Sequence, residues 1–248
     1  MEKLLDEIES YWSTRTEGYS EVNHKELAGT QKNAWLKVLT SQFPDKPKEE
    51  IRILDIGTGP GFFPVILAEA GYHVDAVDYT EGMLEKAKEN AGDLCRNIRF
   101  LRMDAQKLDF EDNTFDVVIS RNLTWNLEHP DVAYREWVRV LKVGGRLLNF
   151  DANWYGYLYE EEQRKAYEND RKNVENNSLD DHYLCTDIER MERIALQVPL
   201  SKISRPQWDV KTLREAGLLG IRTDTEIWKT VWSEEERLNY QSTPMFMV

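Results

Sequence analysis

The sequence predicts an α/β protein built around a doubly wound, mostly parallel sheet. Between residues 51 and 150, short apolar runs alternate with amphipathic stretches, which is the pattern of consecutive strand–helix–strand units. Many residues in these runs are β-branched, as expected for strands that are buried on both faces. A length of 248 residues fits one elaborated domain better than two full domains.

The expected elements follow in order along the chain. Residues 1–42 are predicted to be helical, ending at the breaker run 44–47. The predicted strands are 51–56, 73–77, 98–102, 115–120 and 146–150. Helices are expected from about Phe62, after an N-cap at Thr80, and from Pro130, which suits a first helical turn.

The second half of the chain departs from this rhythm. Residues 160–176 form a charged, helix-like stretch, and Ile188, Met191 and Ile194 indicate a second amphipathic helix. We interpret 151–205 as a helical insertion. After a helix around Leu213, the strand-like runs 221–232 and 240–248 are expected to pair at the sheet edge, giving seven strands in all.

Composition excludes several classes of protein. With 32 Lys and Arg against 45 Asp and Glu, the net charge is −13, so nucleic acid is not expected as a partner. No run of ~18 apolar residues appears, and the first residues are charged, so neither a membrane span nor a signal peptide is expected. Cys95 and Cys185 stand far apart without other metal-ligand residues at suitable spacing, so no disulfide framework and no metal site are expected. A reducing cytoplasm fits these features best.

The run from Ile53 to Phe63 carries the strongest chemical signal. A buried strand leads directly into Gly57, Gly59 and Gly61 and then into a helix, so a ligand can approach bare backbone and the unpaired N–H groups of a helix start. An ordinary tight turn is the alternative. However, Phe62 stands where a dinucleotide fingerprint needs its third glycine, and Asp55 would repel a pyrophosphate but attract an ammonium group. The turn therefore indicates a ligand with an amine and no phosphates, which disfavours a nicotinamide-dependent oxidoreductase.

Two further acids follow the next strands. Asp78 ends the second strand about 20 residues past the first glycine, where a carboxylate can bind ribose hydroxyls. Asp104, followed by Ala105, offers a carboxylate and a backbone N–H that match an adenine edge. Taken alone, each acid would be read as a cap or a surface turn residue.

Together these residues resemble the class I S-adenosylmethionine-dependent methyltransferases, in particular the small-molecule, methyltransferase type 11-like branch. The resemblance is strong over 51–150, where 115–120 and 141–147 also match the fourth strand and the turn into the fifth. It implies a Rossmann-like methyltransferase fold with S-adenosylmethionine as cofactor and S-adenosylhomocysteine as product. The implied cofactor-binding residues are Asp55, Gly57, Thr58, Gly59, Gly61, Asp78, Tyr79, Met83, Asp104, Ala105, Arg121 and Asn122.

The resemblance also suggests a division of a single domain into four parts. Residues 1–45 would form a helical lid, 51–150 the cofactor-binding core, 151–205 a helical substrate cover, and 206–248 the last part of the sheet. Candidate lid or substrate residues are Tyr11, Arg15, Tyr19, Trp125, Asn153 and Tyr155. The first three recur every four residues on one helical face, so plain packing is the alternative for them, as local packing is for the others.

The expected function is direct methyl transfer to a small-molecule acceptor, which requires positioning rather than a protein nucleophile. His129 is the candidate general base, against a capping or surface role, and His182 is a weaker one. Methylation of protein or RNA remains an alternative, as does an inactive module that only binds the cofactor. The sequence leaves open the acceptor, the methylated atom and the choice between monomer and homodimer.

Overall fold

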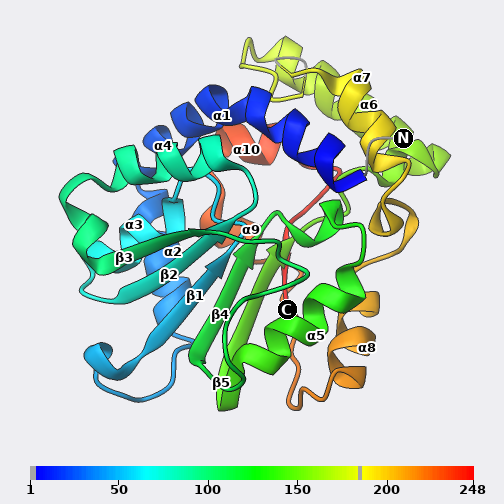
Figure 1. Cartoon of the computed structure of the whole chain (residues 1–248). Coiled ribbons are helices and arrows are strands. Elements are labelled where there is room, and N and C mark those ends of the chain that lie inside the picture. Colours follow the sequence, from blue (N-terminus) through cyan, green and yellow to red (C-terminus); the bar gives the residue numbers. More distant parts are fainter. Residues whose placement is uncertain (1–3, 184–185) are drawn as a thin grey trace.

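The computed structural model describes residues 4–183 and 186–248, so Cys185 and the first three residues lie outside the described residues. Its centre is a six-stranded sheet with the strand order β3-β2-β1-β4-β5-β6 (Figure 1). Strands β1 to β5 pair in parallel, and β6 runs antiparallel to β5. The strands are β1 (Arg52–Ile56), β2 (His73–Asp78), β3 (Ile98–Arg102), β4 (Phe115–Arg121), β5 (Leu141–Asp151) and β6 (Phe246–Met247).

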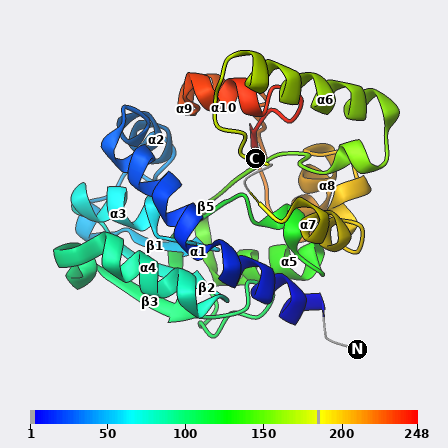
Figure 2. The same cartoon turned by 90° about the horizontal axis from the view of Figure 1, so that it is seen from above.

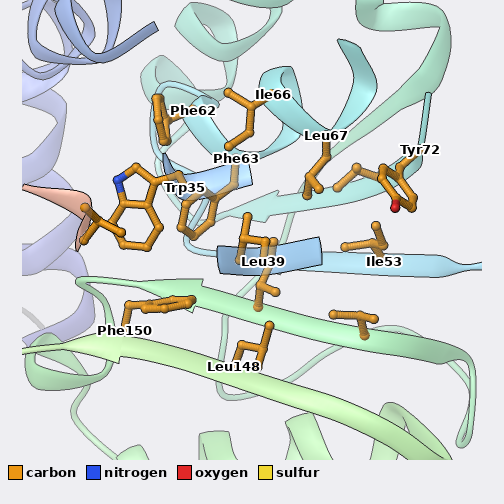
Figure 3. Close-up of a cluster of buried hydrophobic side chains, with 14 of the residues drawn as sticks. Trp35, Leu39, Ile53, Phe62, Phe63, Ile66, Leu67, Tyr72, Leu148 and Phe150 are labelled. Atoms are coloured by element: carbon orange, nitrogen blue, oxygen red, sulfur yellow. The ribbon is translucent and has the colours of Figure 1, made fainter. Parts of the chain in front are cut away.

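Helices cover both faces of the sheet, as the apolar faces of the parallel strands require. On one face, Trp35 of α2, Phe63 of α3 and Phe150 of β5 belong to a buried cluster (Figure 3). The same cluster also includes a residue of α9. On the other face, Tyr134 and Trp137 are part of a second cluster with Leu213. The helices are α1 (Leu4–Ala28), α2 (Gln31–Thr40), α3 (Phe62–Glu69), α4 (Glu81–Ala91), α5 (Pro130–Val140), α6 (Glu161–Asn176), α7 (Ile188–Ala195), α8 (Gln207–Glu215), α9 (Trp228–Val231) and α10 (Glu234–Asn239).

The predicted doubly wound α/β class is confirmed, and β1 to β4 lie where the apolar runs place them. The fifth strand was expected over 146–150, but β5 already begins at Leu141, because this residue pairs with Phe115 of β4. Local signals act as expected at several helix ends. Pro130 occupies the first turn of α5, and Ser233 and Glu236 form a reciprocal capping box at the start of α10. Thr80 stands at the N-cap position of α4, but its side chain makes no capping hydrogen bond. Its backbone N–H instead donates to Asp78 Oδ1 at 2.8 Å.

The prediction of seven strands is wrong for the described residues, because 221–232 does not form a strand. This run contributes one isolated bridge, between Asp224 and Met247. The Asp224 carboxylate accepts a hydrogen bond from the backbone N–H of Glu226 at 2.8 Å, which turns the chain into α9. The second expected run, 240–248, supplies only β6, whose two residues pair with the end of β5.

The N-terminal helix α1 crosses the carboxyl ends of the parallel strands, as the view from above shows (Figure 2). Polar contacts join it to the core along its length. Glu9 pairs with Arg102 at 2.7 Å, Trp12 Nε1 donates to Asn126 Oδ1 at 2.7 Å, and Glu17 pairs with Lys86 at 2.9 Å. None of the helices in the described part of the chain combines the length and the apolar composition that a membrane crossing requires.

Candidate functional site

The glycine loop between β1 and α3 is held against the second strand. The backbone N–H groups of Gly57 and Thr58 both donate to the carbonyl of Val77, at 2.8 and 3.0 Å. Gly57, Gly59 and Gly61 all have positive φ, a conformation that other residues rarely adopt. Gly61 is the N-cap of α3 and supplies no side-chain cap, so the first N–H groups of that helix are not capped by a side chain.

The three glycines differ in what they face. A Cβ on Gly57 would lie 2.7 Å from the Leu123 side chain, and one on Gly61 would lie 3.0 Å from Ala87 of α4. These two glycines therefore serve close packing within the protein. A Cβ on Gly59 would meet only the ring of Tyr19, at 3.5 Å. Gly59 is therefore the glycine of the loop that faces α1.

Asp78 binds the glycine loop directly. Its Oδ2 accepts from the Gly59 N–H at 2.9 Å, and its Oδ1 accepts from the Thr80 N–H. Burial raises the pKa of Asp78, while the two N–H donors act to lower it. The carboxylate thus links the end of β2 to the middle of the loop, and each oxygen retains acceptor capacity for a further donor.

Asp55 is buried at the end of β1. Burial and, to a smaller extent, the nearby Asp78 raise the pKa of Asp55 to about 7, against the lowering influences of Thr58 and Arg121. A carboxyl group in this state exchanges its proton near neutral pH. A cation placed beside it would favour the ionised form.

Four residues predicted to contact the adenosine lie at or after the ends of β2 and β3 and in α4. Asp104 Oδ1 accepts from the backbone N–H of Gln106 at 2.8 Å and from its side chain at 3.1 Å, so this acid closes its own turn. Met83 and Ala105 are buried. Tyr79 lies under the Arg102 guanidinium, which is 5.1 Å from its ring centroid.

Arg121, at the end of β4, has a side-chain role that the sequence does not reveal. Its guanidinium donates to both carboxylate oxygens of Glu26 on α1, at 2.7 and 3.0 Å. It also lies 4.7 Å from the Phe62 ring centroid and 5.2 Å from that of Phe63. The neighbouring Asn122 has a positive φ, and its N–H donates to the carbonyl of Phe150 at 2.8 Å. The end of β4 therefore connects α1 with the glycine-loop helix and β5.

A cavity of about 710 Å³ lies beside this junction. Of the residues predicted for the site, it is lined by Tyr11, Arg15, Tyr19, Arg121, Asn122, Trp125 and Tyr155. The predicted glycine-loop, ribose and adenine residues are not among its lining residues. The cavity therefore adjoins the predicted cofactor region only at the end of β4 and at Tyr19.

The structure does not bring Asn153 and His129 to the cavity. The Asn153 amide instead bonds the backbone of Arg205 twice, each time at 3.1 Å. The His129 side chain is 62% exposed at the start of α5, 3.8 Å from Glu128. Its position is thus that of a surface residue at a helix start, away from the proposed chemistry.

His182 does reach the cavity wall, together with residues that sequence reasoning missed. Its Nδ1 is 2.9 Å from the Tyr240 hydroxyl, and its Nε2 is 3.0 Å from Glu235 Oε1. Trp232, Glu236 and Tyr240 arrive from the C-terminal part of the chain. The sequence signal for these residues was the occurrence of several aromatic residues close to acidic residues in 228–240. However, no feature of this segment's own sequence indicates that it lies near the end of β4.

A buried ionic network supports the wall from behind. Arg205 donates to Asp151 at 2.6 Å and to Asp209 at 2.6 Å, with all three side chains fully buried. Asp151 also accepts from the backbone N–H of Trp125, at 2.9 Å. Trp125 in turn stacks on Tyr155, with ring centroids 4.9 Å apart. The network thereby holds the cavity residue Trp125 against the end of β5.

These features define a class of protein. In open doubly wound sheets, ligands bind beyond the carboxyl ends of the strands, where the strand order reverses. Here that point lies between β1 and β4, which carry Asp55 and Arg121. The chain is thus a Rossmann-like protein whose switch point lies between β1 and β4.

Comparisons with known proteins identify the family. The methyltransferase domain family matches residues 54–149. A demethylmenaquinone methyltransferase of Renibacterium salmoninarum is 31% identical over 148 residues, which is 60% of each chain. A ubiquinone/menaquinone biosynthesis C-methyltransferase of Pseudomonas putida is 41% identical over 103 residues, 39% of this chain and 40% of the relative. The core of this chain therefore belongs to the class I S-adenosylmethionine-dependent methyltransferase superfamily.

Over nearly the whole chain, the likeness to a solved structure is one of fold. A putative S-adenosyl-L-methionine-dependent methyltransferase of Methanococcus maripaludis is 20% identical, with a TM-score of 0.60 over 95% of this chain and 92% of that one. The matches to the first three curated relatives cover 39%, 60% and 56% of their lengths. The cavity wall beyond residue 155 lies outside the matched family segment.

Proposed function

We propose that this protein transfers a methyl group from S-adenosylmethionine to a small-molecule acceptor held in the cavity. One observation carries the proposal: Arg121 at the end of β4 lines the cavity and lies 4.7 Å from the ring centroid of Phe62, the first residue of the helix that follows the glycine loop. A cofactor at the loop would have its reactive end directed to the point where the acceptor space begins. Such proximity is the main requirement of a direct displacement.

The loop residues fit the proposed cofactor. S-Adenosylmethionine has an amine, a carboxylate and a ribose but no phosphate. The loop region offers Asp55, Asp78 and, at the start of α3, backbone N–H groups that no side chain caps. The backbone of Gly59 faces the ring of Tyr19 on α1, which a Cβ at this position would meet at 3.5 Å. Asp55 would pair with the amine, and Asp78, already oriented by the Gly59 N–H, would accept from the ribose. When bound, the cofactor supplies an electrophilic methyl group on a sulfonium.

The chain's own part in the reaction is to position the acceptor and exclude water. In the transfer, a lone pair of the acceptor forms the bond to the methyl carbon while the carbon–sulfur bond breaks, its electrons remaining on sulfur. A proton on the acceptor atom leaves to a base or to water. We propose α1 as the lid of this space, because Tyr11, Arg15 and Tyr19 line the cavity and Glu26 holds the helix to Arg121. His182 replaces His129 as the candidate base, since it lies in the wall.

Some relatives carry names that specify demethylmenaquinone as the acceptor, so a small molecule is the favoured acceptor class here as well. The net charge of −13 and the lined cavity argue against RNA and against an extended polypeptide. A protein that binds the cofactor without turnover is the remaining alternative.

Calorimetry with S-adenosylhomocysteine tests the cofactor assignment. We expect binding by the wild-type protein, at least about tenfold weaker binding by Asp78→Asn, and unchanged binding by Asp93→Asn, an exposed acid beyond α4. Failure of the wild-type protein to bind would overturn the proposal. Release of S-adenosylhomocysteine in the presence of an acceptor panel then separates an enzyme from an inactive binding module.

A further inference from the structure

The cavity wall is rich in aromatic rings. Nine of its described lining residues are aromatic, and they come from α1, from the ends of β4 and β5, and from the segments beyond residue 182. They are Tyr11, Trp12, Tyr19, Trp125, Trp154, Tyr155, Tyr183, Trp232 and Tyr240. Tyr240 lies at the centre of one group, with ring centroids 5.2 Å from Trp154 and 5.6 Å from Trp232.

The same wall has an excess of negative charge. Six carboxylates line it, from Glu21, Glu26, Asp180, Asp181, Glu235 and Glu236, against three cationic side chains, from Arg15, Lys25 and Arg121. Two of the cations already have a carboxylate from the wall, since Arg121 pairs with Glu26 and Lys25 lies 4.0 Å from Asp180. Across the described residues, neither Glu235 nor Glu236 forms an ion pair with a lysine or arginine side chain.

The wall also contains an acceptor that lacks a donor. Asn23 on α1 is only 2% exposed, and within the described part of the chain its Oδ1 receives no hydrogen bond. A buried polar atom without a partner is costly, so such an atom in a ligand cavity indicates a complementary group on the ligand. The complementary group for a carbonyl oxygen is an N–H or O–H donor.

We infer that the acceptor is an organic cation, an amine carried on an apolar or aromatic body. This inference rests on the proposed function and specifies its substrate class. Aromatic faces attract ammonium groups, unpaired carboxylates attract positive charge, and an amine supplies the N–H donor that Asn23 lacks. The volume of about 710 Å³ is within the range of ~300–1,000 Å³ typical of pockets that enclose whole small molecules.

The other acceptor classes satisfy the wall less well. A neutral quinone ring would stack on the aromatic side chains but would bring no positive charge to Glu235, whose ionic partner in the wall is His182. An anionic acceptor would add to the negative charge of the wall. An organic cation is the acceptor class that can interact favourably with the aromatic rings, the carboxylates and the Asn23 amide oxygen at the same time.

Three probes of matched size test the inference: 3-phenylpropylamine, 3-phenylpropan-1-ol and 4-phenylbutanoate. Each is titrated by calorimetry into the intact protein saturated with S-adenosylhomocysteine. We expect the amine to bind at least about tenfold more tightly than the alcohol, a difference of ~1.4 kcal/mol, and the carboxylate to bind more weakly than both. Added salt should weaken binding of the amine and leave binding of the alcohol unchanged.

A pair of neighbouring variants on α10 provides the control. Glu235→Gln removes a carboxylate of the wall. It should weaken binding of the amine about three- to tenfold and keep the affinity for the alcohol within about twofold of the wild-type value. Glu234→Gln makes the same charge change at an exposed position outside the lining and should alter neither. Circular dichroism and thermal unfolding verify that both variants fold.

The outcomes separate the two proposals. Equal binding of amine and alcohol, tighter binding of the alcohol or the carboxylate, or equal effects of the two variants would overturn the cationic acceptor. Binding of S-adenosylhomocysteine would then still stand. If S-adenosylhomocysteine itself does not bind, the proposed function fails instead.

Discussion

Arg121 at the end of β4 and Glu26 near the end of α1 form a buried two-bond ion pair, at 2.7 and 3.0 Å. The two residues are 95 positions apart in the chain. Their side chains are 13% and 5% exposed, so the pair is largely removed from water. It joins the helix that crosses the strand ends to the residue at which the cofactor region and the cavity meet.

Replacing Glu26 by Gln should lower the free energy of unfolding by about 3 kcal/mol, because the Arg121 charge would remain buried without its counter-ion. Urea unfolding at pH 7 measures this loss, and hydrogen exchange should show that α1 opens more readily. Glu21→Gln, an exposed change on the same helix, should shift the free energy by less than about 0.5 kcal/mol. Equal stability of the two variants would show that the pair does not hold α1.

Replacing Arg205 by Met should cost about 3–5 kcal/mol, since Asp151 and Asp209 would be left as buried charges without a cation. The triple variant Asp151→Asn, Arg205→Met, Asp209→Asn should be more stable than Arg205→Met alone, because no buried charge remains. Arg135→Met removes an exposed pair with Asp131 and should cost at most ~0.5 kcal/mol. Denaturant unfolding of the four proteins checks the order, and a triple variant weaker than the single one would contradict it.

Asp55 should make stability depend on pH. The pKa of Asp55 is raised by burial to about 7 in the folded protein, against roughly 3.9 for an unfolded chain, so the folded state holds this proton more strongly. Its contribution to stability is complete below about pH 4 and is lost as pH rises through about 7. Compared with wild type, Asp55→Asn should therefore gain relative stability between pH 5 and pH 8, on the order of a few kcal/mol.

Urea unfolding at the two pH values measures this difference, with Asp93→Asn as an exposed control. A constant difference between wild type and Asp55→Asn would mean that Asp55 is ionised in the folded protein throughout this range.

The two candidate histidines should differ in their effect on turnover. His129 is exposed and outside the cavity, so His129→Ala should keep kcat/KM within about twofold of wild type. His182 lies in the wall beside Tyr240 and Glu235, so His182→Ala should lower kcat/KM at least about tenfold. The measurement is release of S-adenosylhomocysteine with an acceptor identified from the panel. The reverse order would restore His129 as the candidate base.

The sequence by itself determined the parallel core. Strands that are buried on both faces appear in the sequence as short apolar runs. The glycines and acids that follow β1 and β2 are local sequence signals of a ligand-binding sheet edge. For this reason β1 to β4 and the helices between them lie close to their predicted bounds. The sheet edge was predicted less well, because pairing there depends on a few contacts, and the Asp224 turn outweighed the strand-like pattern of 221–232.

Only the tertiary structure decided the composition of the cavity wall. His129 follows β4 directly and looked closer to the site than His182, yet the chain beyond residue 151 folds back over the strand ends and brings His182, Trp232 and Tyr240 into the wall. The side chain of Arg121 likewise pairs with Glu26, and this ion pair forms only because α1 lies against the end of β4. Periodicity encodes which face of an element is buried, but it carries no information about which distant element covers that face, because this contact depends on the packing of the whole chain.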